Sequence, residues 1–189
     1  MKVSRAGRNG GPAAGLTAGL AALAIALFAS PLAAQTDMSG VAAGFLGAYG
    51  SFHPSTGIPD AAGRARLAPY LSPALNKMLA DGAAAEARFA ARFKNSPPLI
   101  EGDLFSSMFE GATAWKLGTC SASGTTARCP VGFTHAQAGH PPVTWTDTLL
   151  LANTAAGWRV DDIAYGAGFQ FGNTGKLTDT LRTVLREAP

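Results

Sequence analysis

The residue with the clearest potential for chemistry in this chain is Asp147. Four apolar residues alternate with polar ones around it: Val143, Trp145, Leu149 and Leu151. This period of two predicts a β-strand with one apolar face, and Asp147 has the parity of that face. A carboxylate on an inner face must be hydrogen-bonded, paired or open to a cavity. Asp147 is therefore either the general base of a pocket or a structural anchor that binds Arg159 or a loop amide.

A second candidate catalytic group is a general acid that would act with Asp147. Tyr165 lies at the end of the next predicted strand, and His135 lies at the end of an earlier one. Either side chain could exchange a proton with a bound substrate. The three histidines, His53, His135 and His140, form no local ligand motif, so the sequence predicts no metal site. It also contains no phosphate loop or dinucleotide fingerprint and therefore predicts no cofactor.

A set of aromatic side chains on the predicted strands could line a ligand pocket. Its members are Trp115, Phe133, Trp145 and Trp158. Asp103, which follows a glycine in an irregular segment, could lie at the mouth of such a pocket or cap a turn. Aromatic residues at strand spacing also form ordinary hydrophobic cores. The pattern leaves both interpretations open.

The only two cysteines, Cys120 and Cys129, flank the sequence SGTT at 123–126, which predicts a turn. Their spacing differs from the C-x-x-C of redox sites, and no neighbouring histidine pair completes a zinc site. An even pair in an exported protein favours a disulfide bond. We therefore predict a disulfide bond that closes a hairpin.

The first 34 residues have the composition of a secretory signal peptide. Lys2, Arg5 and Arg8 precede an uncharged apolar run over 16–29, and small residues follow up to Ala34. The run is shorter than the roughly 20 residues that span a membrane. We expect cleavage after Ala34 and a single periplasmic or secreted domain over 35–189. An uncleaved membrane anchor is the alternative.

The charge balance argues against a nucleic-acid partner. The chain has 15 Lys and Arg against 12 Asp and Glu, and three of the basic residues lie before position 35, where no acid occurs. Residues 35–189 thus carry no net charge and contain no dense basic run. A nucleic-acid-binding domain would need a basic patch.

Helix signals occupy the first half of the expected domain. Ser39 is expected to cap a first helix, and Asp60 a short second helix that ends before Pro69. Ser72, followed by proline, is expected to cap a third helix, in which Gly82 predicts a bend or break. Apolar residues at helical spacing predict a C-terminal amphipathic helix: Leu177, Leu181, Val184 and Leu185.

Strand signals follow residue 112. The ranges 113–120 and 128–135 predict two strands joined across the cysteine hairpin, and 143–165 predicts a second hairpin. Trp158 and Val160 share one parity but Ile163 has the other, so we expect a β-bulge near Asp161 and Asp162. Helices segregated from antiparallel strands predict an α+β fold. In this fold, N-terminal helices pack on a curved sheet of about four strands, with a helix at the C-terminus.

The second hairpin resembles part of a bacterial exported family. The resemblance rests on GWRVDDI at 157–163, Trp145 and Asp147 before it, GDLFSS at 102–107 and the helix start LSxxL at 71–75. The family is domain of unknown function 3828, and the resemblance covers residues 40–186. It implies a nuclear transport factor 2-like fold, a cone of curved sheet and helices around a pocket. It implies no catalytic residue, because none is established for the family.

The sequence favours a non-catalytic binding or protein-interaction domain whose target is a periplasmic protein or a small apolar ligand. The first alternative is an isomerase or hydrolase with Asp147 as base and Tyr165 or His135 as acid. The second is a cell-envelope structural protein, for which a large exposed apolar patch would be the mark. No stable membrane anchor is expected after cleavage, and the sequence leaves the oligomeric state open.

Overall fold

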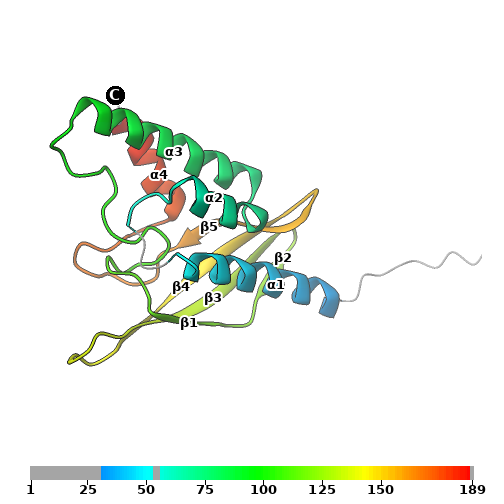
Figure 1. Cartoon of the computed structure of the whole chain (residues 1–189). Helices are drawn as coiled ribbons and strands as arrows, with labels where there is room; N and C mark the ends of the chain where they lie inside the picture. The colour runs from blue at the N-terminus through cyan, green and yellow to red at the C-terminus, as the bar shows by residue number, and fades with distance from the viewer. Residues whose placement is uncertain (1–30, 53–55, 188–189) are drawn as a thin grey trace, which may run out of the picture.

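The computed structural model describes residues 31–52 and 56–187. Within these residues the chain forms four α-helices and an open antiparallel sheet of five strands (Figure 1). The helices are α1 (Pro31–Gly50), α2 (Ala61–Leu67), α3 (Pro73–Arg92) and α4 (Leu177–Glu187), with a 3₁₀ turn η1 (Ala68–Tyr70) after α2. The strands are β1 (Ala114–Leu117), β2 (Ser121–Ser123), β3 (Thr126–His135), β4 (Val143–Thr154) and β5 (Gly157–Ala164). The predicted α+β class is confirmed.

The first helix begins earlier than expected. α1 starts at Pro31, so Ser39 lies inside the helix and does not cap it, and this prediction is wrong. Proline is favoured at the first helical position because its missing N–H needs no partner there. The expected signal peptide lies outside the described residues, except that the backbone of residues 31–34, which includes Ala34, belongs to α1.

The caps of the next two helices are as predicted. Gly63 N donates to Asp60 Oδ1 at 2.7 Å at the start of α2, and Leu75 N donates to Ser72 Oγ at 3.0 Å at the start of α3. Each side chain satisfies one of the backbone donors that a helix N-terminus leaves unpaired. α3 runs unbroken through Gly82, so the expected break is absent; this glycine is buried and close to Ile58 and Leu181.

The sheet has the order β1–β3–β4–β5, and β2 also pairs with β3, next to β1 along the same edge. The sequence predicts one strand over 113–120, but the structure divides this region into β1 and β2. Gly118 N donates to Pro130 O at 2.8 Å between them. Gly124, at the turn between β2 and β3, has the positive φ of 61° that a tight hairpin requires.

The β4–β5 hairpin contains the predicted β-bulge. Leu150 pairs with Asp162 and Leu151 with Val160, so Asp161 is the extra residue on β5. The bulge places Ile163 on the buried side, as its sequence parity requires. On β4, four residues of the predicted inner face are buried: Trp145, Asp147, Leu149 and Leu151. Val143, at the strand start, is exposed.

Cys120 and Cys129 form the predicted disulfide bond, with their Cα atoms 4.2 Å apart. Both side chains are buried, between β1 and β2 on one side and within β3 on the other. The bond fixes the short β2–β3 hairpin to the sheet. It is compatible with an oxidising, exported location, because disulfide bonds persist in such compartments.

We expect the double variant Cys120→Ala with Cys129→Ala to lower the free energy of unfolding by about 2–3 kcal/mol, mainly because the unfolded chain gains loop freedom. Urea unfolding followed by tryptophan fluorescence measures the change. The wild-type protein in excess reductant should unfold at the urea midpoint of the double variant. Equal midpoints for oxidised wild type and double variant would contradict a stabilising bond.

The helices contact the sheet and one another at different places. α1 contacts β1, β3 and β5, whereas α3 packs against α4 and also touches β5.

No helix among residues 31–52 and 56–187 is both long and apolar enough to cross a membrane.

Three connecting segments meet at one end of the sheet, on the left of Figure 1. β1 starts, β3 ends, β4 starts and β5 ends at this end, because Ala114 pairs with Thr134 and His135 with Val143. The segments are residues 93–113, 136–142 and 165–176. We call this region the loop end of the molecule.

Candidate functional site

The loop end is organised around a buried segment of irregular backbone. Residues 102–107, the GDLFSS sequence, are all buried and belong to no helix or strand. Buried backbone without regular structure needs other hydrogen-bond partners. We call residues 102–107 the buried loop, and its partners include the acids and aromatic residues that the sequence marks as candidates.

Asp147 is the main partner of the buried loop. Its side chain is 1% exposed and accepts four hydrogen bonds. Ser107 N donates to Oδ2 at 2.8 Å, and the Ser107 hydroxyl donates to Oδ1. Trp145 Nε1 donates to Oδ2 at 3.0 Å, and Gly166 N donates to Oδ1 at 2.8 Å. Each carboxylate oxygen thus receives two hydrogen bonds. None of the four donor groups belongs to an acidic or basic side chain.

These contacts favour the structural interpretation of Asp147. The loop-amide partner expected for an anchor is present twice, in Ser107 and Gly166. Arg159 lies opposite Ala152, and its guanidinium donates instead to Trp158 O at 2.6 Å. A general base needs a free lone pair directed at a substrate. The four donors occupy the lone pairs of Asp147, which therefore ties β4 to two loops.

Gly166 allows the second of these loops to approach β4. A Cβ atom at this position would lie 2.0 Å from Thr146 O, a backbone atom that cannot move aside alone. Glycine therefore brings the Gly166 amide within reach of Asp147. In the glycine-rich sequence GAGFQFG at 166–172, the first glycine is thus required by the close packing of the loop against β4.

Asp103 and Tyr49 fix the other end of the buried loop to α1. Asp103 is 1% exposed; Phe105 N donates to its Oδ1 at 2.7 Å, and Tyr49 Oη donates to its Oδ2 at 2.7 Å. The Phe105 contact is the turn cap that the sequence leaves open for Asp103. Tyr165 Oη donates to Leu104 O at 2.7 Å, so this candidate acid also holds the buried loop.

Burial keeps the two tyrosines protonated. It raises the pKa of Tyr49 far above the ordinary 10.0, and the negative charge of Asp103 raises it further. Burial likewise raises the pKa of Tyr165, with the charges of Asp103, Asp162 and Asp147 adding to the effect. Both hydroxyls are therefore expected to remain protonated donors above pH 10, where an exposed tyrosine would ionise.

We expect the free energy of unfolding to fall as the pH rises above about 10. A raised native pKa means that the folded state holds a proton the unfolded chain releases, so the contribution of Tyr49 is complete below pH 10.0 and is lost at higher pH. Each of the two tyrosines adds up to about 1.4 kcal/mol per pH unit to this slope. Urea unfolding between pH 8 and 11.5 measures it; Tyr49→Phe should flatten the slope, and an unchanged slope would contradict this origin.

The glycine-rich loop is attached to the buried loop by Asn173. Its side-chain amide donates to Asp103 O at 2.6 Å and to Ser106 O at 2.7 Å, and its backbone N–H donates to Ser107 O at 3.0 Å. One asparagine thus satisfies three carbonyl groups of the buried loop. The glycine-rich loop, residues 166–173, is therefore held at both of its ends, by Gly166 on Asp147 and by Asn173 on the buried loop.

Asp162, next to the bulge, anchors the last helix. Thr178 N donates to Asp162 Oδ1 at 3.0 Å and Thr178 Oγ1 donates to Oδ2 at 2.8 Å, and the carboxylate also accepts from Ile163 N at 2.9 Å. Its negative charge lies at the N-terminus of α4, where the helix dipole favours an anion. Asp162 is therefore a structural anchor that ties β5 to the start of α4.

The structure places the aromatic pocket candidates among other buried side chains. The Phe133 and Trp145 rings stack with centroids 5.6 Å apart, and Phe169 meets the other side of Trp145 at 5.4 Å. Trp158 is 6% exposed. Trp115 is half-buried and packs against Tyr49 at 5.9 Å. These side chains support the sheet and α1, and the described open pockets at the loop end are lined by other residues.

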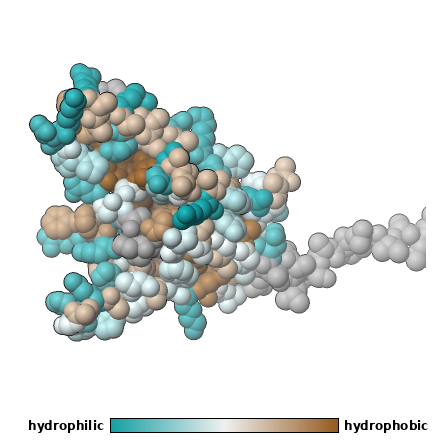
Figure 2. Space-filling model, viewed as in Figure 1, coloured by the Kyte–Doolittle hydropathy of each residue, from teal (hydrophilic) through white to brown (hydrophobic). Residues whose placement is uncertain are grey.

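Two open pockets lie at the loop end, where the surface is indented between projecting lobes (Figure 2). The first, about 440 Å³, lies between residues 108–110 and 135–143; the second, about 560 Å³, lies between residues 98–110 and the Gln170–Phe171 tip. Glu110 lines both. Two smaller pockets, of about 310 and 320 Å³, lie elsewhere on the described surface, so the loop end offers a ligand the larger openings of these four.

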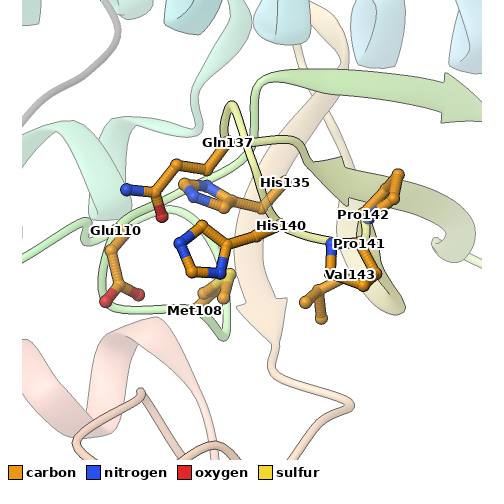
Figure 3. A pocket seen from close by; sticks show the side chains of 8 residues that line it. All are labelled: Met108, Glu110, His135, Gln137, His140, Pro141, Pro142 and Val143. Carbon is orange, nitrogen blue, oxygen red and sulfur yellow. The ribbon is translucent and has the colours of Figure 1, made fainter.

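The first pocket contains the candidate His135. Figure 3 shows His135 and His140, from the end of β3 and the following turn, facing the segment that carries Met108 and Glu110. His135 Nδ1 lies 2.8 Å from Gly111 O, which leaves Nε2 for a ligand. Among the described residues, no three His, Cys, Asp or Glu side chains come together in a way that could hold a metal ion.

Sequence reasoning misses several residues that build this region. Ser107, Asn173 and Tyr49 have no pattern that marks them, because their contacts join residues 40 to 70 positions apart. Phe171 is missed because the glycines at 166–172 predict a connecting segment and not a helix or strand. A bulky residue among glycines at 166–172 is the one signal that could have drawn attention to it.

Comparisons with known proteins give no relative for this chain. No protein-family model, no curated protein and no solved structure matches it.

Proposed function

We propose that this protein is an exported, non-catalytic binding domain that holds its partner at the loop end. The observation that carries the proposal is Phe171, whose side chain is 82% exposed at the tip of the glycine-rich loop. Exposed aromatic residues on fixed supports are typical anchors of protein interfaces. Membership of the domain of unknown function 3828 family, with its nuclear transport factor 2-like fold, is part of the same proposal and is supported by the sequence resemblance alone.

The backbone of Phe171 gives further support. Gly172 N donates to Phe169 O at 3.1 Å and closes a turn in which Phe171 has a φ of 62°. Glycine or asparagine normally occupies such a position, because a Cβ atom is strained there by about 1 kcal/mol. The backbone strain at Phe171 lowers the stability of the fold, and its exposed ring buries too little apolar area to offset that cost. Residues of this kind occur at functional sites.

The two ends of the glycine-rich loop are held by hydrogen bonds, which supports a binding role for Phe171 and not an incidental exposure of its ring. Asn173 bonds three carbonyl groups just after the tip, and Gly166 bonds Asp147 just before it. A preformed loop loses little conformational freedom when it binds, so more of the contact energy appears as affinity. The hydrogen-bonded acids thus explain how the loop end is held without a catalytic role for Asp147.

Export is supported by the N-terminal composition and by the Cys120–Cys129 disulfide bond. The neutral charge of residues 35–189 supports a partner other than nucleic acid. A binding domain in the periplasm or outside the cell accounts for these features together.

Affinity capture with residues 35–189 as bait, from the periplasmic extract of the source cells, tests the proposal. Phe171→Asn removes the ring but keeps a residue that tolerates the left-handed turn, so its free energy of unfolding should not fall. We expect it to lose the captured partner. Phe93→Ala is the matched control, because Phe93 is 41% exposed directly after the end of α3 and lines neither of the two pockets.

Two results would contradict the proposal. Equal loss with Phe93→Ala would show that capture reports exposed phenylalanine in general. Full retention with Phe171→Asn would show that the tip takes no part in binding.

A further inference from the structure

The two pockets of the loop end together form a surface that carries two carboxylates, Glu110 between the pockets and Glu101 in the second pocket. Glu110 lines both pockets. On one side of it the lining includes Met108 and Val143, and on the other it includes Leu99 and Phe171. Apolar side chains therefore lie on both sides of Glu110, next to the polar groups of His135, Gln137 and His140 in the first pocket and of Glu101 and Gln170 in the second.

The acids of this surface have no lysine or arginine partner among the described residues, although His135 and His140 line the first pocket together with Glu110. Glu101, in the second pocket, and Glu110 are both exposed, and neither makes a hydrogen bond or ion pair with another side chain or backbone group of residues 31–52 and 56–187. Glu86, on α3, differs in this respect, because Leu99 N donates to its two carboxylate oxygens at 3.1 and 3.0 Å. Two unpaired carboxylates at an apolar groove complement a partner that brings a positive charge.

The apolar parts of the surface restrict the partner further. Val143 is 37% exposed and Phe171 is 82% exposed, so each offers area that an apolar side chain could bury. Burial of one such side chain contributes more to affinity than an exposed ion pair does. A purely cationic ligand would leave this area in water. The partner must therefore carry apolar groups on both sides of its charge.

We propose that the loop end binds an extended peptide segment of another protein, with a lysine or arginine on Glu110 and an apolar side chain in each pocket. In an extended chain, alternate side chains point to the same side. The segment thus has the pattern apolar–x–basic–x–apolar, with its apolar residues at the first and fifth positions. This inference rests on the proposed binding function and names the chemistry of its partner.

Capped pentapeptides test the pattern directly. The probe Leu-Ser-Lys-Ser-Leu is titrated into ¹⁵N-labelled residues 35–189 and followed by amide chemical shifts. The matched controls replace Lys by Glu, or both Leu by Ser. We expect shifts at residues 99, 108–110, 143 and 171 with the probe, and at least tenfold weaker binding with either control.

Protein variants separate the two parts of the inference. Glu110→Gln should weaken binding of the Lys probe about fivefold and leave any binding of the Glu control unchanged or stronger. Glu187→Gln, at the end of α4 and outside both pockets, should change neither. Phe171→Asn should weaken every probe that carries Leu.

The outcomes distinguish this inference from the proposed function. Equal binding of the Lys and Glu peptides, or shifts outside the loop end, would overturn the peptide pattern. If Phe171→Asn still abolishes capture of a protein partner in that case, the binding function stands and only its chemistry is wrong. If lysine amide alone binds as well as the pentapeptide, the site takes small cations and the peptide assignment is wrong.

Discussion

Asp147→Asn should lower the free energy of unfolding by about 3–5 kcal/mol, the largest effect we expect of a single isosteric change. The carboxylate accepts hydrogen bonds from Ser107 N, the Ser107 hydroxyl, Gly166 N and Trp145 Nε1. An asparagine side chain keeps one oxygen and turns an NH₂ group towards two of these donors. Two buried donors then lose their acceptor, and an unsatisfied buried donor costs more than a hydrogen bond contributes.

Urea unfolding of residues 35–189 measures this change. Asp161→Asn is the matched control, because Asp161 is a half-buried acid on the neighbouring strand whose side chain has no hydrogen bond within the described part of the chain. We expect it to stay within about 0.5 kcal/mol of the wild type. A small effect of Asp147→Asn would mean that the two loops are not held by this carboxylate, and the rigid base proposed for Phe171 would fall with it.

Gly166→Ala should lower the free energy of unfolding by about 2–4 kcal/mol, a large effect for one methyl group. The added Cβ atom would lie 2.0 Å from Thr146 O, so the glycine-rich loop must move away from β4. That movement lengthens the hydrogen bond from Gly166 N to Asp147 and leaves the amide without a partner. The cost therefore combines steric repulsion with a lost hydrogen bond to a charged acceptor.

Gly168→Ala provides a sharp control in the same loop. A Cβ atom at Gly168 would meet nothing within 4 Å, and we expect the stability to change by less than about 0.5 kcal/mol. Both variants reduce the freedom of the unfolded chain equally, so their difference isolates the approach of the loop to β4. Equal stabilities would show that the loop tolerates displacement. Gly166→Ala should also weaken binding at Phe171, since the base of the tip shifts.

The two predictions together separate support from recognition. Asp147 and Gly166 act on the base of the glycine-rich loop, whereas Phe171 acts at its exposed tip. Changes at the base should reduce stability and binding together. Phe171→Asn should reduce binding alone. A catalytic role for Asp147 would instead require loss of an activity without loss of stability.

The outcome for individual acids shows where sequence reasoning is strong. Asp147 could be placed on the inner face from its parity alone, because a strand alternates its side chains. The β-bulge at Asp161 could be predicted for the same reason, since Ile163 would otherwise face solvent. The helix caps at Asp60 and Ser72 follow from local hydrogen bonds within three residues. The predicted start of the first helix at Ser39 is wrong, because the helix continues towards the N-terminus through Leu32, Ala33, Ala34 and Gln35, which favour helix, to Pro31.

By itself the sequence determined the α+β class, the disulfide pair, the inner face of β4 and the bulge in β5. Each depends on contacts that are local or on a pattern with a fixed period. Only the tertiary structure decided the role of Asp147 and the shape of the loop end. Ser107, Gly166 and Asn173 reach their partners across 19 to 70 residues, and no periodicity records such pairings. Whether a buried acid is a base or an anchor depends on the donors around it, and those donors come from loops whose paths the sequence pattern does not fix.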